Sequence, residues 1–330
     1  MDHVRLGNTG LKVSRLCLGT MTFGLQCDEP TSVAIMDRAA EGGITFLDTA
    51  DAYPLGGGQE IAGRTEEIIG RWLKGRRDDY ILATKCFVPM GPRPFQGGNS
   101  RRHIMNAAEA SLRRLGTDYI DLYQLHGHDP QTPVDETLEA LTDLVRAGKV
   151  RYVGCSNHLA YQVARAIGRS EARGLVRYVS VQPRYNLLFR EFERELIPLC
   201  IEDGLGIIPY NPIAGGMLSG KHDRSKEPPE GRFGQQNYAG TMYRQRYWQD
   251  PVFDKVEALQ ALATEAGLAL PTLAVAWVAA QPGITSPIIG ASKPAQLDAT
   301  LAALDAKLGP DLLARLDELT REFRRGDSAR

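Results

Sequence analysis

Four ionisable residues of different kinds stand where short apolar runs of the sequence end. Asp48 and Tyr53 lie in FLDTADAY, Lys85 follows ILAT, and His126 follows LYQL. A tyrosine with a pKa near 10 is a weak acid at neutral pH, but a neighbouring ammonium lowers that pKa. Lys85 can supply this charge while Asp48 keeps it protonated and fixed. We therefore predict that Tyr53 acts as general acid toward a carbonyl oxygen, with His126 hydrogen-bonding the carbonyl or the phenol.

Each of these residues also has an ordinary structural role. An aspartate can cap a loop, a tyrosine can pack, a lysine can be solvated, and a histidine can satisfy a local hydrogen bond. The joint placement on three successive strand ends favours the chemical interpretation. Hydride must then come from a nicotinamide, because no side chain can donate one. His126 and His128 form an HxH pattern without a third ligand at useful spacing, so we predict no metal site.

The elements that must position these residues follow a regular alternation of short apolar runs and longer amphipathic segments. We interpret the runs as strands over Arg15–Leu18, Thr45–Asp48, Tyr80–Thr84, Tyr119–Gln124, Tyr152–Cys155, Tyr178–Val181, Gly206–Pro209 and Ser286–Ile289. We expect helices near 31–42, 61–74, 100–115, 133–147, 159–170, 191–203, 252–266 and 293–304. This alternation predicts an α/β protein built from βα units. Eight units without a linker favour a single (β/α)8 TIM barrel domain over residues 1–330, rather than a doubly wound open sheet.

Three additions to the barrel are expected. Residues 4–6 and 11–13 flank the turn-forming Gly-Asn-Thr-Gly and predict an N-terminal β-hairpin that plugs the bottom of the barrel. Two extra late helices are predicted over Leu270–Ala280 and Pro310–Arg321. The Gly- and Pro-interrupted segment 222–250 predicts an irregular loop, either mobile or serving as a lid.

Composition excludes several classes of protein. Hydrophobic residues make up 43% of the chain and the formal net charge is −1, so we expect neither nucleic acid nor a membrane as partner. Five cysteines without a CxxC pattern favour a reducing compartment, and the N-terminus has no signal-like apolar run, so we expect a cytoplasmic protein. The most apolar stretch, 268–284, is interrupted by prolines and predicts a buried helix.

The sequence resembles the aldo-keto reductase superfamily along nearly its full length. The matching stretches, in order, are LGNTGLKVSRLCLGTMTFG, GITFLDTADAY, ILATK, SLRRLGTDYIDLYQLHGHD, GKVRYVGCSNH, VQPRYNLL, GIIPYNPIAGGMLSGK and PIIGASKPAQLDATL. Several independent motifs in one order make a specific match. The resemblance implies a (β/α)8 barrel, NADPH-dependent reduction of an aldehyde or ketone, or the reverse, and a catalytic tetrad of Tyr53, Lys85, Asp48 and His126.

The resemblance also implies where NADP(H) binds. The nicotinamide end is expected at Gly19, Thr20, Met21, Ser156, Asn157, Gln182 and Tyr210. The pyrophosphate is expected along a loop that contains Asn211, Pro212, Ile213, Gly216, Leu218, Gly220 and Lys221. The adenosine end is expected at Gly290, Ser292, Lys293, Gln296 and Thr300, where Thr300 replaces an asparagine common in the family. Pairing of Ser292 and Lys293 with a 2′-phosphate would favour NADPH over NADH.

Other functions stay open at this point. Part of the same superfamily resembles the β subunits of potassium channels, which bind NADPH but serve chiefly as partners. Lys85 could instead form a Schiff base with a carbonyl substrate, as in an aldolase. The absence of a GxGxxG fingerprint argues against a Rossmann site. The favoured partner is a small carbonyl compound, whose identity the sequence leaves open, as it does the oligomeric state.

Overall fold

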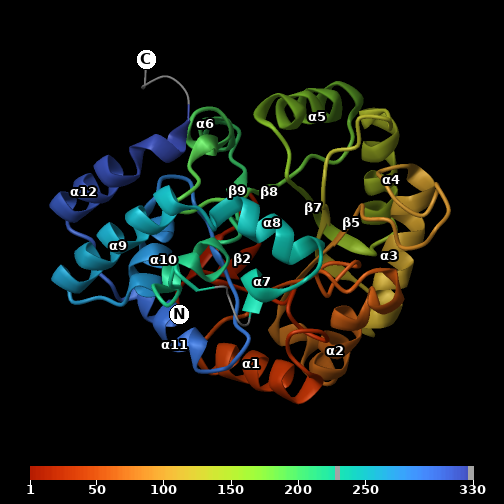
Figure 1. Cartoon of the computed structure of the whole chain (residues 1–330). Helices are drawn as coiled ribbons and strands as arrows, with labels where there is room; N and C mark the ends of the chain where they lie inside the picture. Colours follow the sequence, from red (N-terminus) through yellow and green to blue (C-terminus); the bar gives the residue numbers. More distant parts are fainter. Residues whose placement is uncertain (227–230, 326–330) are drawn as a thin grey trace.

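The computed structural model describes residues 1–226 and 231–325 and confirms the (β/α)8 barrel (Figure 1). Eight parallel strands pair in the order β10-β3-β4-β5-β6-β7-β8-β9. They are β3 (Cys17–Gly19), β4 (Phe46–Asp48), β5 (Ile81–Cys86), β6 (Ile120–Leu125), β7 (Val150–Ser156), β8 (Ser180–Gln182), β9 (Gly206–Ile207) and β10 (Ile288–Ile289). The two ends of the sheet are joined by backbone hydrogen bonds of 2.8 Å from Thr285 N to Ile207 O and from Ile288 N to Pro209 O.

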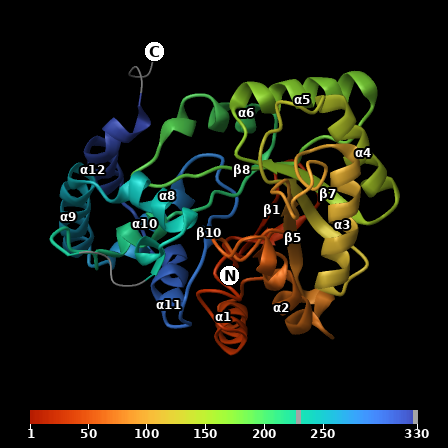
Figure 2. The same ribbon diagram turned by 45° about the vertical axis from the view of Figure 1, so that its right-hand side comes forward.

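Helices cover the outside of the strands. They are α1 (Glu29–Glu41), α2 (Arg64–Leu73), α3 (Arg101–Leu115), α4 (Val134–Arg146), α5 (Ala160–Arg173), α6 (Leu196–Glu202), α9 (Asp250–Glu265), α10 (Leu270–Ala280), α11 (Gln296–Leu301) and α12 (Pro310–Thr320). Local signals set their ends: the Ser100 side chain caps α3, and Gly116 ends α3 in a left-handed conformation at φ 62°. Figure 2 shows α9, α10 and α12 grouped on the side opposite α3 and α4.

The predicted N-terminal hairpin is present at the amino ends of the barrel strands. Strand β1 (His3–Arg5) pairs antiparallel with β2 (Lys12–Ser14). Leu6 and Val13 are fully buried and belong to the same core cluster as Phe46 and other strand residues of the barrel. The hairpin therefore closes the bottom of the barrel, and the opposite end is left for a site.

Both predicted late helices are confirmed as α10 and α12. Nearly all of α10 is buried, as expected for the most apolar stretch of the sequence. Among the described residues, no single helix has the length and apolarity to cross a membrane. Only α9 and α10 taken together satisfy that test, and they are bent by 90° relative to each other.

Segment 222–250 is more ordered than the expected irregular loop. Apart from residues 227–230, which lie outside the described part, it contains α7 (Gly231–Gly234) and α8 (Tyr238–Tyr247). The Asn237 side chain starts α8 by accepting a hydrogen bond from Gly240 N. Tyr247 is buried, so this part of the segment packs against the rest of the protein. The prediction of irregular structure was wrong for residues 231–234 and 238–247, because aromatic packing, rather than a regular aliphatic period, holds α8.

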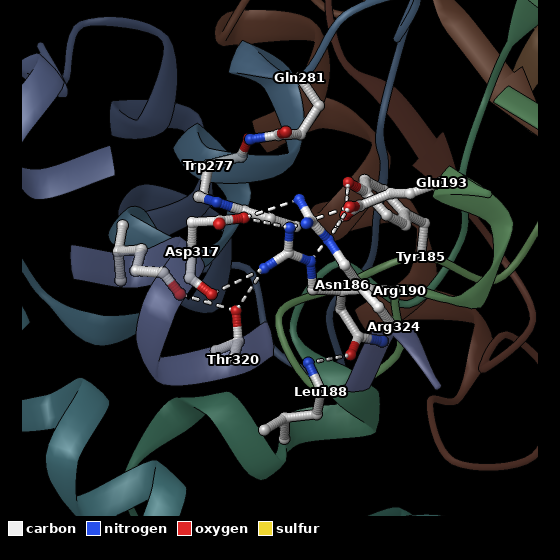
Figure 3. Close-up of polar contacts among 11 residues, drawn as sticks. Tyr185, Asn186, Leu188, Arg190, Glu193, Trp277, Gln281, Asp317, Thr320 and Arg324 are labelled. Atoms are coloured by element: carbon white, nitrogen blue, oxygen red, sulfur yellow. Dashed lines mark hydrogen bonds and ion pairs between the residues drawn. The ribbon is translucent and has the colours of Figure 1, made fainter. Parts of the chain in front are cut away.

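A buried charge cluster attaches the C-terminal helix to the loop after β8 (Figure 3). Arg190 has only 1% of its surface exposed. Its guanidinium donates to Glu193 Oε1 at 2.7 Å, Asp317 Oδ1 at 2.6 Å and Thr320 Oγ1 at 2.8 Å. Arg324 donates to the same two carboxylates. Because every buried charge in this cluster has a partner of opposite sign, the cluster can fix α12 against the barrel.

Candidate active site

A cavity of about 580 Å³ opens at the carboxyl ends of the barrel strands. One face of α8 covers it, with Tyr238, Met242, Tyr243 and Arg246 on its wall. Figure 1 shows α7 and α8 lying across the mouth of the barrel. The Asn237 side chain donates to Gly56 O at 3.2 Å, so the start of α8 is attached to the loop that follows Tyr53. Segment 231–248 therefore covers the cavity, which is the position expected of a lid.

A buried ion pair lies at the base of the cavity. Lys85 Nζ donates to Asp48 Oδ2 at 2.5 Å and to Thr49 O at 2.8 Å. The other carboxylate oxygen of Asp48 accepts from Gln182 Nε2 at 2.8 Å and from Gln124 Nε2 at 3.1 Å. Both Asp48 oxygens are thus occupied, which holds the carboxylate in one orientation. Gln124 is a contact that the sequence did not predict; a glutamine in a fully buried strand was the available signal.

Lys85 is fully buried and protonated. Burial by itself would lower the pKa of its ammonium, but the charges of Asp48 and Tyr53 outweigh burial and raise that pKa above its usual value. The ammonium therefore stays charged at every pH at which the protein is expected to work. A protonated lysine is a poor nucleophile, so the Schiff-base hypothesis is not favoured by this geometry.

Tyr53 lies on the cavity wall with 8% of its surface exposed. The Lys85 ammonium is 5.1 Å from the centre of its ring, and the His126 ring meets it edge-on with centroids 5.7 Å apart. Burial raises the pKa of Tyr53, and the charge of Lys85 offsets only part of that increase. The expected lowering of this pKa was wrong, because desolvation of the phenolate outweighs the neighbouring cation. Tyr53 is a neutral proton donor at neutral pH.

His126 contributes a neutral imidazole. Burial, helped by the charge of Lys85, lowers the pKa of His126 to about 3. The ring lines the cavity, and its buried Nδ1 has no hydrogen-bond partner among the described residues. A neutral ring next to Tyr53 can orient a substrate oxygen by hydrogen bonding without competing as an acid.

Polar residues after β7 and β8 form the wall beside this group. Ser156 Oγ donates to Gln182 O at 2.8 Å, and Asn157 Nδ2 donates to His126 O at 2.9 Å. Asn157 adopts a left-handed conformation at φ 56°, which turns its side chain back over the strand ends. Tyr210 Oη donates to Asn157 Oδ1 at 2.8 Å. These contacts bring together four of the residues predicted to meet the nicotinamide: Ser156, Asn157, Gln182 and Tyr210.

The other end of the cavity is built by the loop after β9. Gly215 and Gly216 have φ of 71° and 106°, conformations that residues with a side chain rarely adopt. Asn211 Nδ2 is buried without a hydrogen-bond partner among the described residues, although Asn211 lines the cavity. Lys221 and Arg232 also lie on this wall. Two cations and an unpaired amide donor make this end suited to an anionic ligand.

The structure brings most of the predicted site residues to this cavity. The predicted residues on its wall are Asp48, Tyr53, His126, Gly19, Thr20, Met21, Ser156, Asn157, Gln182, Tyr210, Asn211, Pro212, Ile213, Gly216, Lys221, Gly290, Ser292, Gln296 and Thr300. Lys85 lies behind this wall. Leu218, Gly220 and Lys293 are not on it: Leu218 is fully buried in the core, Gly220 ends a 3-10 helix, and Lys293 is exposed.

Several wall residues were missed by the sequence analysis. Five of them, Arg232, Tyr238, Met242, Tyr243 and Arg246, come from α7 and α8. The available signal was the excess of arginine and tyrosine in a segment that was otherwise expected to be irregular.

Other chemistries find less support among the described residues. In that part of the chain, no three His, Cys, Asp or Glu residues gather in a way that could hold a metal ion. His128 packs edge-on against His158, with centroids 5.4 Å apart. All five cysteines are free and buried.

Comparison with known proteins identifies the family. The signature of the Aldo/keto reductase family matches residues 15–321. The chain belongs to the aldo/keto reductase family. It is 40% identical to an uncharacterized oxidoreductase of Bacillus subtilis, over 97% of this chain and 96% of that protein. It is also 35% identical to a probable voltage-gated potassium channel subunit beta of Arabidopsis thaliana, over 97% of this chain and 96% of that protein. Versiconal hemiacetal acetate reductase of Aspergillus parasiticus is 32% identical, over 96% of each chain. Family membership and these names support an oxidoreductase.

Proposed function

We propose that this aldo/keto reductase is a cytoplasmic enzyme that reduces an aldehyde or ketone with NADPH, Tyr53 serving as the proton donor. The observation that carries the proposal is the buried Asp48–Lys85 ion pair beneath Tyr53, with neutral His126 beside it, opening on one cavity. A phenol backed by a fixed cation and facing a cavity is suited to protonating an oxygen that becomes negative during reaction.

The residues present fit a phosphorylated dinucleotide. The cavity volume lies within the range usual for cofactor sites. Lys221, Arg232 and the unpaired Asn211 Nδ2 can receive phosphate oxygens at one end. Tyr210 and Gln182 can receive the nicotinamide near Tyr53 at the other end. Bound there, a reduced nicotinamide would supply the hydride that no side chain can supply.

The chain's own residues would handle the proton and the developing charge. Tyr53 donates its hydroxyl proton to the carbonyl oxygen, and Lys85 stabilises the phenolate that remains. Asp48 keeps Lys85 charged and in place. His126, being neutral, orients the carbonyl oxygen by a hydrogen bond. Since the pKa of Tyr53 is raised in the protein, the donor is fully protonated at neutral pH, and the fixed ammonium compensates for its weak acidity.

Tyr53→Phe tests this function, because it keeps the ring packing and removes only the hydroxyl. We expect kcat for a generic aldehyde such as 4-nitrobenzaldehyde to fall about 10²- to 10⁴-fold, the usual contribution of a general acid. The Kd of NADPH, measured by fluorescence titration, is expected to change less than about twofold. Tyr161→Phe is the matched control, since Tyr161 is 63% exposed and outside the cavity. An unchanged kcat in Tyr53→Phe would eliminate Tyr53 as the acid.

We further propose that NADPH is preferred over NADH. Ser292 and Gln296 lie on the cavity wall, and Lys293 is exposed next to them. A lysine at that position can reach a 2′-phosphate with its flexible side chain. Lys293→Ala is expected to raise the Kd of NADPH more than that of NADH. Equal weakening of both would mean that the 2′-phosphate is bound by another group, with Arg232 the next candidate.

A partner role is the second candidate function. Its support is the similarity to the probable potassium channel subunits. Turnover separates the two functions: NADPH oxidation with a panel of aldehydes and ketones supports the enzyme. Tight NADPH binding without oxidation by any member of the panel would favour the partner role.

A further inference from the structure

Two arginines near the catalytic end of the cavity have no carboxylate partner. Arg246 lies on the cavity wall from α8, and Arg184 follows β8. Within residues 1–226 and 231–325, no ion pair joins either guanidinium to an acid within 4.0 Å. Glu191 is the acid that acts on Arg184 from farther away, and it is itself paired with Arg325 at 3.4 Å. Arg190, by contrast, binds two carboxylates, Glu193 and Asp317 (Figure 3).

Arg184 lies beside Tyr210, because the backbones of these two residues form an isolated parallel bridge, and Arg246 shares the cavity wall with Tyr210. Burial lowers the pKa of Arg184, and the charge of Arg246 lowers it further. Both charges also act on the Tyr210 hydroxyl, so both groups lie near the proposed nicotinamide wall. Like charges that are partly withdrawn from water destabilise the protein unless an anion joins them. A planar guanidinium is matched in shape to a carboxylate, which it can bind through two parallel hydrogen bonds.

The position of Arg246 on α8 relates it to the reacting group. Met242 and Arg246 are about one helical turn apart, about 6 Å along the axis, and both line the cavity. Tyr243, next to Met242, lines the same cavity as Tyr53. A molecule whose carbonyl meets Tyr53 can therefore extend along α8 toward Arg246.

Apolar side chains line the cavity that Tyr53 and Arg246 share. Met242 from α8, Leu55 from the loop after Tyr53, and Val88 from the loop after β5 all line the cavity. They would accept an aromatic ring or a short aliphatic chain. A ligand that satisfies the whole region has a carbonyl at one end, an apolar body, and an anionic group at the other end.

We propose that the substrate is an aldehyde or ketone that carries a carboxylate, and that Arg246 binds this carboxylate with Arg184 adding to the positive field. This inference rests on the proposed reductase function and specifies its substrate class. The cofactor's phosphates are the competing anions, but Lys221 and Arg232 already stand on the wall formed by the loop after β9 and by α7. The experiment must therefore measure the kinetics of the substrate and the affinity for the cofactor separately.

The test compares 4-carboxybenzaldehyde with its methyl ester, which has nearly the same shape but no charge. For the wild-type protein we expect kcat/KM to favour the acid by about 10-fold or more. Arg246→Gln is expected to lower kcat/KM for the acid about 10- to 100-fold, mainly through KM, the usual effect of losing a charged hydrogen bond. The ester and the Kd of NADPH are expected to change less than about twofold. Arg165→Gln is the control for net charge, since Arg165 is exposed on α5 and outside the cavity.

The outcomes distinguish the inference from the function on which it rests. Turnover of both compounds without preference for the acid, or equal losses for both in Arg246→Gln, would overturn the carboxylate site and leave the reductase standing. A large rise in the Kd of NADPH would assign Arg246 to the cofactor and also overturn it. No turnover of either compound by the wild type would remove both proposals. If Arg246→Gln does not fold, Arg246→Lys is the alternative, since it keeps the charge but cannot make the bidentate hydrogen bond. A smaller decrease of kcat/KM, selective for the acid, is then expected.

Discussion

Replacing Asp48 by asparagine isolates the buried charge of Lys85. Asp48 accepts hydrogen bonds from Lys85 through one oxygen and from Gln182 and Gln124 through the other. An asparagine offers one oxygen and one NH2 group. Its NH2 group must therefore lie against another donor, either the Lys85 ammonium or the two glutamine amides. With its counter-ion gone, the fully buried Lys85 can stay charged at a cost of about 3–5 kcal/mol, or it can lose its proton.

Loss of the proton sets an upper limit on the cost, and this limit depends on pH. Neutralising a lysine with a reference pKa of about 10.4 costs about 1.4 kcal/mol per pH unit below that value. The limit is about 3 kcal/mol at pH 8 and about 2 kcal/mol at pH 9. In Asp48→Asn the pKa of Lys85 would be lower in the folded than in the unfolded state. The unfolded state then binds more protons, and stability must rise with pH.

Urea unfolding at pH 7, 8 and 9, followed by far-UV circular dichroism, checks this result. We expect the free energy of unfolding of Asp48→Asn to lie about 3 kcal/mol below wild type at pH 8, with the difference shrinking by about 1 kcal/mol at pH 9. The double variant Asp48→Asn/Lys85→Met removes the buried charge and lets the asparagine oxygen face the two glutamines. Its stability relative to wild type is expected to be independent of pH. A penalty for Asp48→Asn that stays the same at all three pH values would refute the assignment of a buried, charged Lys85.

Two further predictions concern the charge cluster around Arg190 and the pH dependence of the active site. Arg190→Met is expected to lower the free energy of unfolding by about 3–5 kcal/mol in urea titrations, because Glu193 and Asp317 lose their buried partner. Arg324→Met is the control: its side chain is 43% exposed and it should cost less than about 1 kcal/mol, so equal losses would contradict the argument. For aldehyde reduction, kcat/KM in initial-rate assays is expected to stay level between about pH 6 and 9, since His126 has a pKa of about 3 and the raised pKa of Tyr53 keeps the donor protonated until above pH 10. An inflection near pH 6.5 that disappears in His126→Gln would show that the imidazole titrates in the working range.

The sequence predicted the barrel and the convergence of the four polar residues for the same reason. Strand ends of parallel βα units meet at one face, so residues placed just after successive apolar runs must lie together. Segment 222–250 could not be predicted this way. Its helix α8 is held by tertiary contacts such as Asn237 with Gly56 and Tyr243 with Asn211, which no local period encodes. The pKa of Tyr53 was also beyond the sequence, because its sign depends on how burial compares with the field of Lys85.

Hydrogen bonds of the loop after β8 link the buried charge cluster to the cavity. Asn186, four residues before Arg190, donates from its amide nitrogen to Asn211 O at 2.9 Å and lies 3.1 Å from Tyr247 Oη. Asn211 in turn accepts from Tyr243 Oη at 3.1 Å through its side-chain oxygen. One asparagine thus joins the end of α8 to the loop proposed to follow the pyrophosphate. Because α8 carries Arg246 and the loop carries Asn211, a movement of α8 away from the cavity must break the contacts of Tyr247 with Asn186 and of Tyr243 with Asn211. The position of the cover and the shape of the anionic end of the cavity are therefore coupled through the same side chain.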